Sequence, residues 1–102
     1  MSEERPMSEK RIPIILCCGL NGRAVVYGRV NSEPVKGEPV ILHDARMVLH
    51  WAGNHGLFGV AAYGPGPGSR ISPAVERTQE TVWQEHLVVS VAAAAKIEAW
   101  DE

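Results

Sequence analysis

One short segment of the chain concentrates residues whose types suit ligand binding. Trp51 precedes a turn in which Asn54 and His55 stand between Gly53 and Gly56. An indole offers a plane for stacking, an amide offers a donor and an acceptor, and glycines let backbone N–H groups approach a ligand closely. The segment therefore predicts a binding lip for a ligand or a partner. The competing interpretation is that Trp51 fills the core, because a small domain needs its large aromatic side chains for packing.

Arg46 lies shortly before this segment and adds a group that suits anions. Its guanidinium is a planar fork of donors that matches a carboxylate or a phosphate. Asp44 is expected on the same, solvent-facing side of the same strand, and exposed pairs of this kind are usually salt bridges worth under about 1 kcal/mol. The sequence therefore predicts Arg46 either in an anion-binding site or in a surface ion pair.

Histidines and cysteines are the side chains of this sequence best suited to bind a metal or to act as catalytic groups. The spacings of the four histidines match no zinc pattern, and His43 and His50 would lie on opposite faces of a continuous strand. Cys17 and Cys18 are adjacent in an apolar run, where free thiols pack as small hydrophobic groups. We expect two reduced thiols, a cytoplasmic setting, no metal, no cofactor and no catalytic residue.

Two further groups of residues give no sign of catalysis. The loop Gly64 to Gly68 resembles a phosphate cradle, but its two prolines remove backbone donors that such a cradle needs. It is better interpreted as a spacer at a subunit contact or as the edge of a pocket. Glu76, Glu80 and Glu85 have no evident partner across a cleft, which acid–base catalysis would require. They are expected to be solvated charges.

Composition limits the class of protein. A chain of 102 residues with 45% apolar residues can enclose one core. The formal charge is −2 and the basic residues are scattered, which argues against binding to duplex nucleic acid. The apolar runs are well short of the roughly 18 residues needed to span a bilayer. Because a small domain gains stability by burying apolar surface against a copy of itself, we expect a homo-oligomer.

The opening of the chain predicts a tail and a hairpin. Residues 1–10 are charged and lack apolar periodicity, so they are expected to be a flexible tail, and residues 11–102 a single domain. Strands are expected at 12–18 and 23–30, joined by the turn signal Asn21-Gly22. Alternation places one face of the second strand in the core and leaves the other, with Tyr27, largely in water.

The rest of the chain predicts more strand and two helices. A third strand is expected from Val40 to Trp51, either continuous or split by a turn at His43-Asp44. Its inward face would carry Ile41, Ala45, Met47, Leu49 and Trp51, and its outward face Asp44, Arg46 and His50.

After that strand, a short helix over 56–63 would end at Gly64, and strand character returns between Thr78 and Val91. Ser90 would cap a closing helix that reaches Trp100. The predicted fold class is α+β, with a four- to five-stranded, mainly antiparallel sheet, a short middle helix and a C-terminal helix.

Taken together, several of these features resemble a family of small uncharacterised proteins carried by bacteriophages and prophages. The resemblance runs from the first strand to the end of the chain and leaves only the charged tail outside. It is carried by Gly22 and Gly28 of the hairpin, the segment Leu42 to Arg46 continuing to Trp51, Leu57, Ala61-Ala62, Gly64, the strand from Val82 to Val89, and the alanine-rich helix with Trp100. The resemblance implies an origin and supplies no mechanism.

Three classes of function follow from these features. The first is a non-enzymatic accessory protein that binds a host factor or a second copy, as counter-defence proteins do. The second is an oligomer that sequesters a small anionic ligand, with Arg46, Trp51 and the turn Asn54 to Gly56 lining a pocket at the subunit boundary. The third is a structural virion component. A small enzyme is less well supported, because no matched acid, base and nucleophile is visible.

Overall fold

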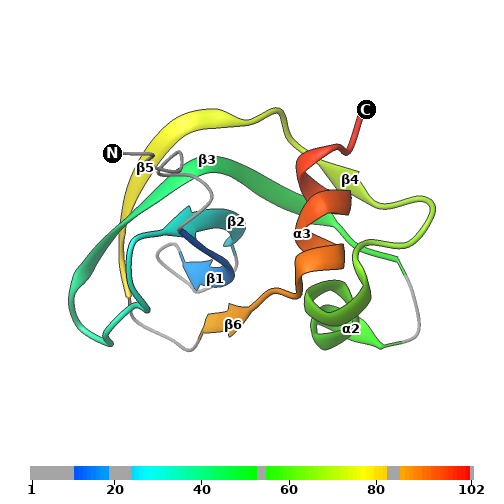
Figure 1. Ribbon diagram of the computed structural model, residues 1–102. Coiled ribbons are helices and arrows are strands. Elements are labelled where there is room, and N and C mark those ends of the chain that lie inside the picture. The colour runs from blue at the N-terminus through cyan, green and yellow to red at the C-terminus, as the bar shows by residue number, and fades with distance from the viewer. Residues whose placement is uncertain (1–10, 19–23, 53–54, 83–85, 102) are drawn as a thin grey trace, which may run out of the picture.

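The computed structural model describes residues 11–18, 24–52, 55–82 and 86–101 (Figure 1). In this part of the chain, six strands form a mainly antiparallel sheet and two helices pack beside it, which confirms the predicted α+β class. Neither of the described helices is long and apolar enough to cross a membrane. The elements are β1 (Ile12–Cys18), β2 (Ala24–Val30), β3 (Pro39–His50), α2 (Gly56–Tyr63), β4 (Arg70–Ile71), β5 (Val75–Thr81), β6 (His86–Val88) and α3 (Val91–Glu98).

The sheet is built around the predicted hairpin. β1 and β2 pair antiparallel along their whole length, from Ile12 opposite Val30 to Cys18 opposite Ala24. Runs of β-branched residues fit this pleated pairing well. The hairpin prediction is confirmed for the two strands, whereas the predicted turn Asn21-Gly22 lies outside the described residues.

β3 connects the hairpin to the rest of the sheet. The strands follow the order β4, β3, β2, β1, β6, and β5 pairs with the half of β3 that β4 does not use. Figure 1 shows β3 and β5 arching over β1 and β2, with both helices gathered at one side. The predicted late strand is divided into β5 and β6. β4, only two residues long, has no signal in the sequence pattern because two residues show no periodicity.

Both faces of the hairpin are buried. One cluster lies under the curved sheet and includes Leu16, Val26 and Leu42, and the other lies under the helices and includes Tyr27 and Ile97. The expectation that the Tyr27 face of β2 is largely wet is therefore wrong, since Tyr27 is 0% exposed. Alternation could not show this, because the cover comes from a helix near the other end of the chain.

A β-bulge changes the alternation of β3. Asp44 adopts a left-handed backbone with φ 53°, and the register slips so that Tyr27 pairs with Arg46 while Arg29 pairs with His43. The extra residue bends the strand but leaves it unbroken, so the continuous alternative is the one observed.

The bulge also overturns the predicted faces of β3. Leu42 and Val48 are buried, together with Ala45 as predicted, whereas Ile41, Met47 and Leu49 are exposed. Those three side chains were predicted to face the core. Leu42 packs in the cluster under the curved sheet and Val48 in the cluster under the helices, so the two halves of β3 bury opposite faces, and a prediction with one inward face is wrong for these three.

The helices begin and end close to where the sequence predicts. α2 ends at Gly64, whose φ is 95° and whose N–H donates to the Val60 carbonyl at 2.9 Å. α3 begins after Ser90, whose hydroxyl accepts from the Ala93 N–H at 3.1 Å. α3 ends two residues before the predicted Trp100. Glycine and serine are favoured at these two positions because they supply the left-handed backbone and the side-chain acceptor that helix ends require.

Candidate functional site

A polar groove lies beside α3, where the ends of β1 and β2 approach the helix and β3. Its volume is about 680 Å³. Its lining contains three arginines and two acids, an unusual share of charge for a protein with 22% charged residues. The lining residues are Arg11, Pro13, Arg29, Asp44, Arg46, Ala74, Val91 and Glu98.

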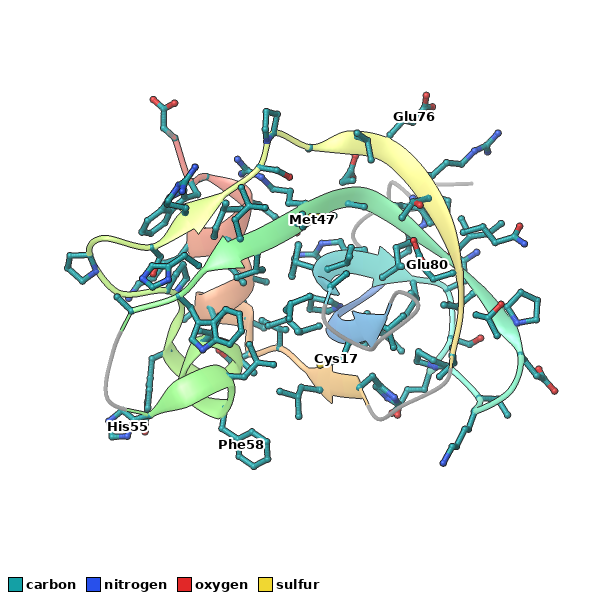
Figure 2. The ribbon with its side chains drawn as sticks, turned by 180° about the vertical axis from the view of Figure 1, so that it is seen from behind. Cys17, Met47, His55, Phe58, Glu76 and Glu80 are labelled. Atoms are coloured by element: carbon teal, nitrogen blue, oxygen red, sulfur yellow. The ribbon has the colours of Figure 1, made fainter. Side chains whose placement is uncertain are left out.

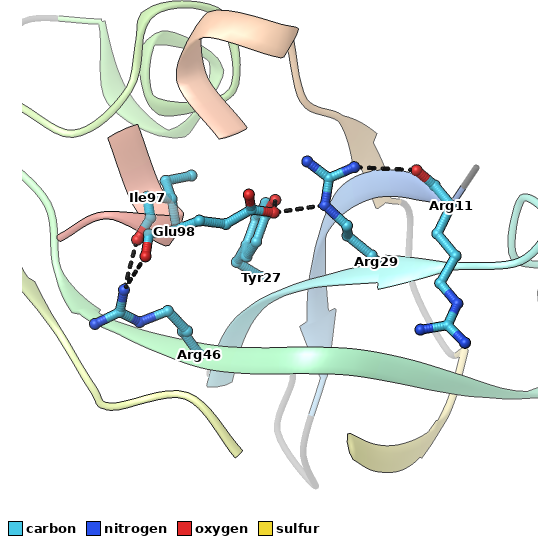
Figure 3. Close-up of polar contacts among 6 residues, drawn as sticks. All are labelled: Arg11, Tyr27, Arg29, Arg46, Ile97 and Glu98. Carbon is cyan, nitrogen blue, oxygen red and sulfur yellow. Dashed lines mark hydrogen bonds and ion pairs between the residues drawn. The ribbon is translucent and has the colours of Figure 1, made fainter. Parts of the chain in front are cut away.

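Glu98, at the end of α3, joins the helix to β2 at one wall of this groove. One oxygen of its carboxylate accepts hydrogen bonds from both the Tyr27 hydroxyl and the Arg29 Nε, each at 2.5 Å (Figure 3). Tyr27 and Arg29 lie two residues apart in β2 and therefore share the face that α3 covers. The carboxylate is thus paired within the protein before any ligand arrives.

The pKa values of these three groups move away from neutrality. Burial, then the hydrogen bond and charge of Glu98, raise the pKa of Tyr27 far above its usual value. Burial alone would raise the pKa of Glu98, but the hydrogen bonds from Arg29 and Tyr27 and the charge of Arg29 together lower it. The hydrogen bond to Glu98 raises the pKa of Arg29. At neutral pH each group is therefore held in its ordinary charge state.

Arg46 binds the C-terminal end of α3. Its Nη1 donates to the carbonyls of Ile97 and Glu98 at 2.7 and 3.1 Å, and its Nη2 donates to the Trp100 carbonyl at 2.8 Å. Its Nε donates to the Ser72 carbonyl at 2.8 Å. The carbonyls of Ile97, Glu98 and Trp100 lie at the negative end of the helix dipole, where a guanidinium is favourable, and the Ile97 carbonyl also accepts from the Trp100 N–H at 3.2 Å.

The position of Arg46 corrects a prediction. Its side chain is 8% exposed and points under α3, whereas the sequence placed it on a solvent-facing side beside Asp44. The surface ion pair is therefore not the role of Arg46. With four donors committed to backbone carbonyls, Arg46 is mainly a structural clamp at the edge of the groove, and little of its fork is left for an anion.

Arg29 retains donors for a ligand. Its Nε is used by Glu98 and its Nη1 donates to the Arg11 carbonyl at 3.2 Å. The remaining nitrogen, Nη2, makes no hydrogen bond to another described residue, and Figure 3 shows it pointing away from the Arg11 contact. Arg11 adds positive charge at the rim, where its Nε donates to the Asn31 side chain at 3.0 Å. The groove can therefore bind an anion through Arg29.

The other predicted site residues lie elsewhere. Trp51 is partly buried and packs against the cluster under the helices. His55 is exposed at the start of α2, with its ring 6.0 Å from that of Tyr63 (Figure 2). Gly56 is exposed with φ 64°, and Asn54 lies outside the described residues. The described lining of the groove includes Arg46 but neither Trp51 nor His55.

The loop of glycines and prolines supports the segment after β3. Pro65 is buried, and a Cβ at Gly66 would lie only 2.9 Å from the Ala52 carbonyl oxygen. Ser69, which follows the loop, accepts a hydrogen bond from the Ala52 N–H at 2.9 Å. The loop therefore packs closely against Ala52, the residue next to Trp51. The loop and Trp51 both contribute to packing.

The cysteine and acidic residues add no further centre. Cys17 is free and partly buried, and it packs against the cluster under the helices. Within the described ranges, no group of three His, Cys, Asp or Glu side chains gathers as a metal site would require. Glu76 extends into solvent from β5, and Glu80 accepts from the Thr78 hydroxyl at 3.3 Å (Figure 2).

Sequence reasoning missed the residues that form the wall of the groove. The alternation of the second strand correctly places Tyr27 and Arg29 on the same face. Glu98 could not be matched to them, because the pairing spans about seventy residues and depends on where α3 lands. Only the positions of α3 and the sheet together reveal this site.

A second, shallower groove lies between α2 and β6. It has a volume of about 440 Å³ and an almost wholly apolar lining formed by Phe58, Ala61, Ala62, Leu87, Val88, Val89 and Ser90. Phe58 is 74% exposed and projects from α2 into solvent (Figure 2). Among the described strands, β6 pairs only with β1, so no other described strand pairs with its second edge.

A family model matches most of the chain. The family is described as a domain of unknown function, DUF6948, and its model matches residues 12–99, which include all of the described strands and both described helices. No curated protein and no solved structure matches the chain. Function must therefore be argued from the geometry.

Proposed function

Because the chain belongs to the DUF6948 family, whose description assigns no activity, we propose from geometry that it is a non-enzymatic binding protein for a small anionic ligand. The ligand would occupy the groove beside α3. The observation that carries this proposal is the unused Nη2 of Arg29 in a groove whose nearest acid, Glu98, is already paired. An arginine held in place by one internal partner is pre-organised for a second.

The electrostatics of the groove support binding over catalysis. A general acid or base works best with a pKa near the operating pH, and enzymes shift such groups toward neutrality. Here the pKa of Glu98 is lowered and the pKa values of Tyr27 and Arg29 are raised, so all three move in the opposite direction. These shifts stabilise fixed charges, and fixed charges suit recognition of an ion.

The first test is a set of calorimetric titrations with phosphate, citrate and hexanoate at low salt. The Arg29→Gln/Glu98→Gln variant removes the anchor without leaving Glu98 as an unpaired charge, and it should lose the binding of whichever anion the wild type takes. Arg77→Gln removes an exposed arginine from β5, which does not line the groove, and should bind as the wild type does. Equal anion binding by the double variant, or no binding of any of the three by the wild type, would refute the proposal.

We also propose, on the sequence resemblance, that this is a phage- or prophage-encoded accessory protein acting in the cytoplasm of the bacterial host. Counter-defence by binding a host factor or sequestering a ligand is consistent with such a small binding domain. Genes of the family should then lie among phage genes, and the protein should fractionate with host cytoplasm. Its presence in purified particles would favour the alternative, a virion component.

The apolar groove favours a second proposal, that two copies pair through it. An open β6 edge can pair antiparallel with the same edge of another copy, which brings both Phe58 side chains into the contact. Phe58 is 74% and Val88 52% exposed, so covering them in both copies contributes about 4–7 kcal/mol. Association itself costs about 4–15 kcal/mol. The balance predicts a weak, concentration-dependent dimer.

Sedimentation velocity over a range of protein concentrations tests this dimer. The wild type should shift toward a larger species as concentration rises, and Phe58→Asp should stay monomeric. Tyr63→Asp is the matched control, because Tyr63 is another exposed aromatic of α2 but does not line the apolar groove. A wild type that is monomeric throughout, or equal effects of both substitutions, would contradict the proposal.

A further inference from the structure

The groove beside α3 contains one acid, Asp44, that has no partner among the described residues. Glu98 is paired with Tyr27 and Arg29, whereas Asp44 forms no hydrogen bond or ion pair with another described residue. On the positive side, Arg29 keeps Nη2 unused. Among the described residues, the groove therefore presents one unpaired acid, Asp44, and two arginines with unused donors, Arg29 and, at the rim, Arg11.

The backbone at Asp44 does not explain its charge. The bulge requires a left-handed conformation, φ 53°, which Gly and Asn adopt as readily as Asp. Either of them would satisfy the backbone without placing a carboxylate in the groove. A strained position at the edge of a groove is also a common place for a residue that contacts a ligand. The carboxylate of Asp44 is thus the part of this residue that the fold leaves unused.

Apolar side chains also line the groove. Pro13, Ala74 and Val91 contribute hydrocarbon surface to its lining, and Val91 is 87% exposed at the start of α3. An exposed valine in a concave lining gains from being covered by methylene groups. The lining therefore suits a ligand with a short hydrocarbon segment that carries its charges.

We propose that the ligand of this groove is a zwitterion whose anionic group binds Arg29 and whose cationic group binds Asp44, with an aliphatic segment against Val91. This inference rests on the proposed anion-binding function and specifies the ligand class. Amino acids with the amine and the carboxylate separated by a methylene chain belong to that class. Recognition of both ends explains why an acid and a base stand ready in one groove.

The test compares ligands that differ only in their end groups. Calorimetric titrations use 6-aminohexanoate, hexanoate and hexylamine, with ω-amino acids of three to eight carbons to find the best length. The zwitterion of the best length should bind about tenfold more tightly than the carboxylate of the same length, as expected for one added charge-assisted hydrogen bond. Asp44→Asn keeps the left-handed backbone and should reduce binding of the zwitterion to the level of the carboxylate. Asp101→Asn, an exposed acid that does not line the groove, should change nothing.

The outcomes separate the two proposals. If carboxylates bind but no zwitterion binds more tightly, or if Asp44→Asn keeps the preference, the zwitterion inference is refuted while the anion site stands. If neither carboxylates nor zwitterions bind, the zwitterion inference is refuted, and the anion proposal fails with it unless phosphate binds. If hexylamine alone binds, Asp44 is a cation site and the assignment of Arg29 is wrong.

Discussion

Replacing Arg46 should cost this protein a large part of its stability. The Arg46→Met substitution keeps the aliphatic stem and removes the guanidinium that binds four carbonyls. The bond to the Ile97 carbonyl is buried and comes from a charged donor, so its loss should cost about 1.5–3 kcal/mol, although this carbonyl keeps its bond from the Trp100 N–H. The other three bonds are partly buried, and their carbonyls can recover water at about 0.5–1 kcal/mol each.

The expected total for Arg46→Met is therefore about 3–6 kcal/mol. A domain of 102 residues has about 5–15 kcal/mol to lose, so the variant should be much weakened or unfolded. Arg46→Lys keeps the charge but not the planar fork, so it cannot reach carbonyls on both Ser72 and Trp100. Its loss should be intermediate, about 2 kcal/mol. This milder variant keeps the experiment interpretable if Arg46→Met does not fold.

Urea unfolding followed by circular dichroism measures these differences. Arg77→Met serves as the control, because this exposed arginine on β5 should change the free energy of unfolding by no more than about 0.5 kcal/mol. If Arg46→Met unfolds with the same slope as the wild type and loses less than about 1 kcal/mol, water satisfies the end of α3 equally well. The clamp would then contribute little, and its role in positioning Glu98 would have to be abandoned.

Three further predictions follow from the contacts around β2. The pKa of Glu98 is lowered in the folded state, so its contribution to stability should be full above the ordinary glutamate pKa of about 4.3 and lost as pH falls through the lower folded pKa. The difference in urea midpoint between the wild type and Glu98→Gln should therefore be smaller at pH 3 than at pH 7. The pKa of Tyr27 is raised, so its contribution to stability should be full below the ordinary tyrosine pKa of about 10 and decline above it. Tyr27→Phe should be less stable than the wild type at pH 7 but should lose less stability between pH 9 and pH 11. Equal losses of stability by both proteins over that alkaline range would contradict this. Gly28→Ala should lower the free energy of unfolding by about 1–3 kcal/mol, because the added Cβ would lie 2.7 Å from the Leu42 Cβ on the neighbouring strand. Thermal unfolding measures this loss, and an unchanged stability would mean that β3 can shift to make room.

The local features of the fold could be predicted because each has a local cause. The hairpin strands follow from β-branched runs, the end of α2 from Gly64, and the start of α3 from Ser90. Each of these signals concerns residues within a few positions of one another, and the chemistry of turns and caps acts over that range. Element type and approximate bounds were therefore within reach of the sequence.

The faces of the strands could not be predicted with the same success. Asp44 inserts a bulge that no composition rule announces, so the two halves of β3 bury opposite faces, and the apolar residues Met47 and Leu49 are exposed. Tyr27 is buried because α3 returns to cover it from the far end of the chain. Both errors come from tertiary placement, which overrides a local period.

The misplacement of Arg46 shows how these two limits combine at the site. An arginine beside an aspartate in an exposed strand is a reasonable prediction of an anion site. In the structure, the carbonyls at the end of α3 accept the hydrogen bonds of Arg46 instead. Once Arg46 is committed there, Glu98 is held at the last turn of the helix, within reach of Arg29. The arginine that we propose binds the ligand is then Arg29 on β2 and not Arg46 on β3. The contacts that hold Arg46 at the end of α3 also position Glu98 in the wall of the groove. Loss of the clamp should therefore weaken anion binding even in variants that remain folded, such as Arg46→Lys, whereas Arg77→Met should not.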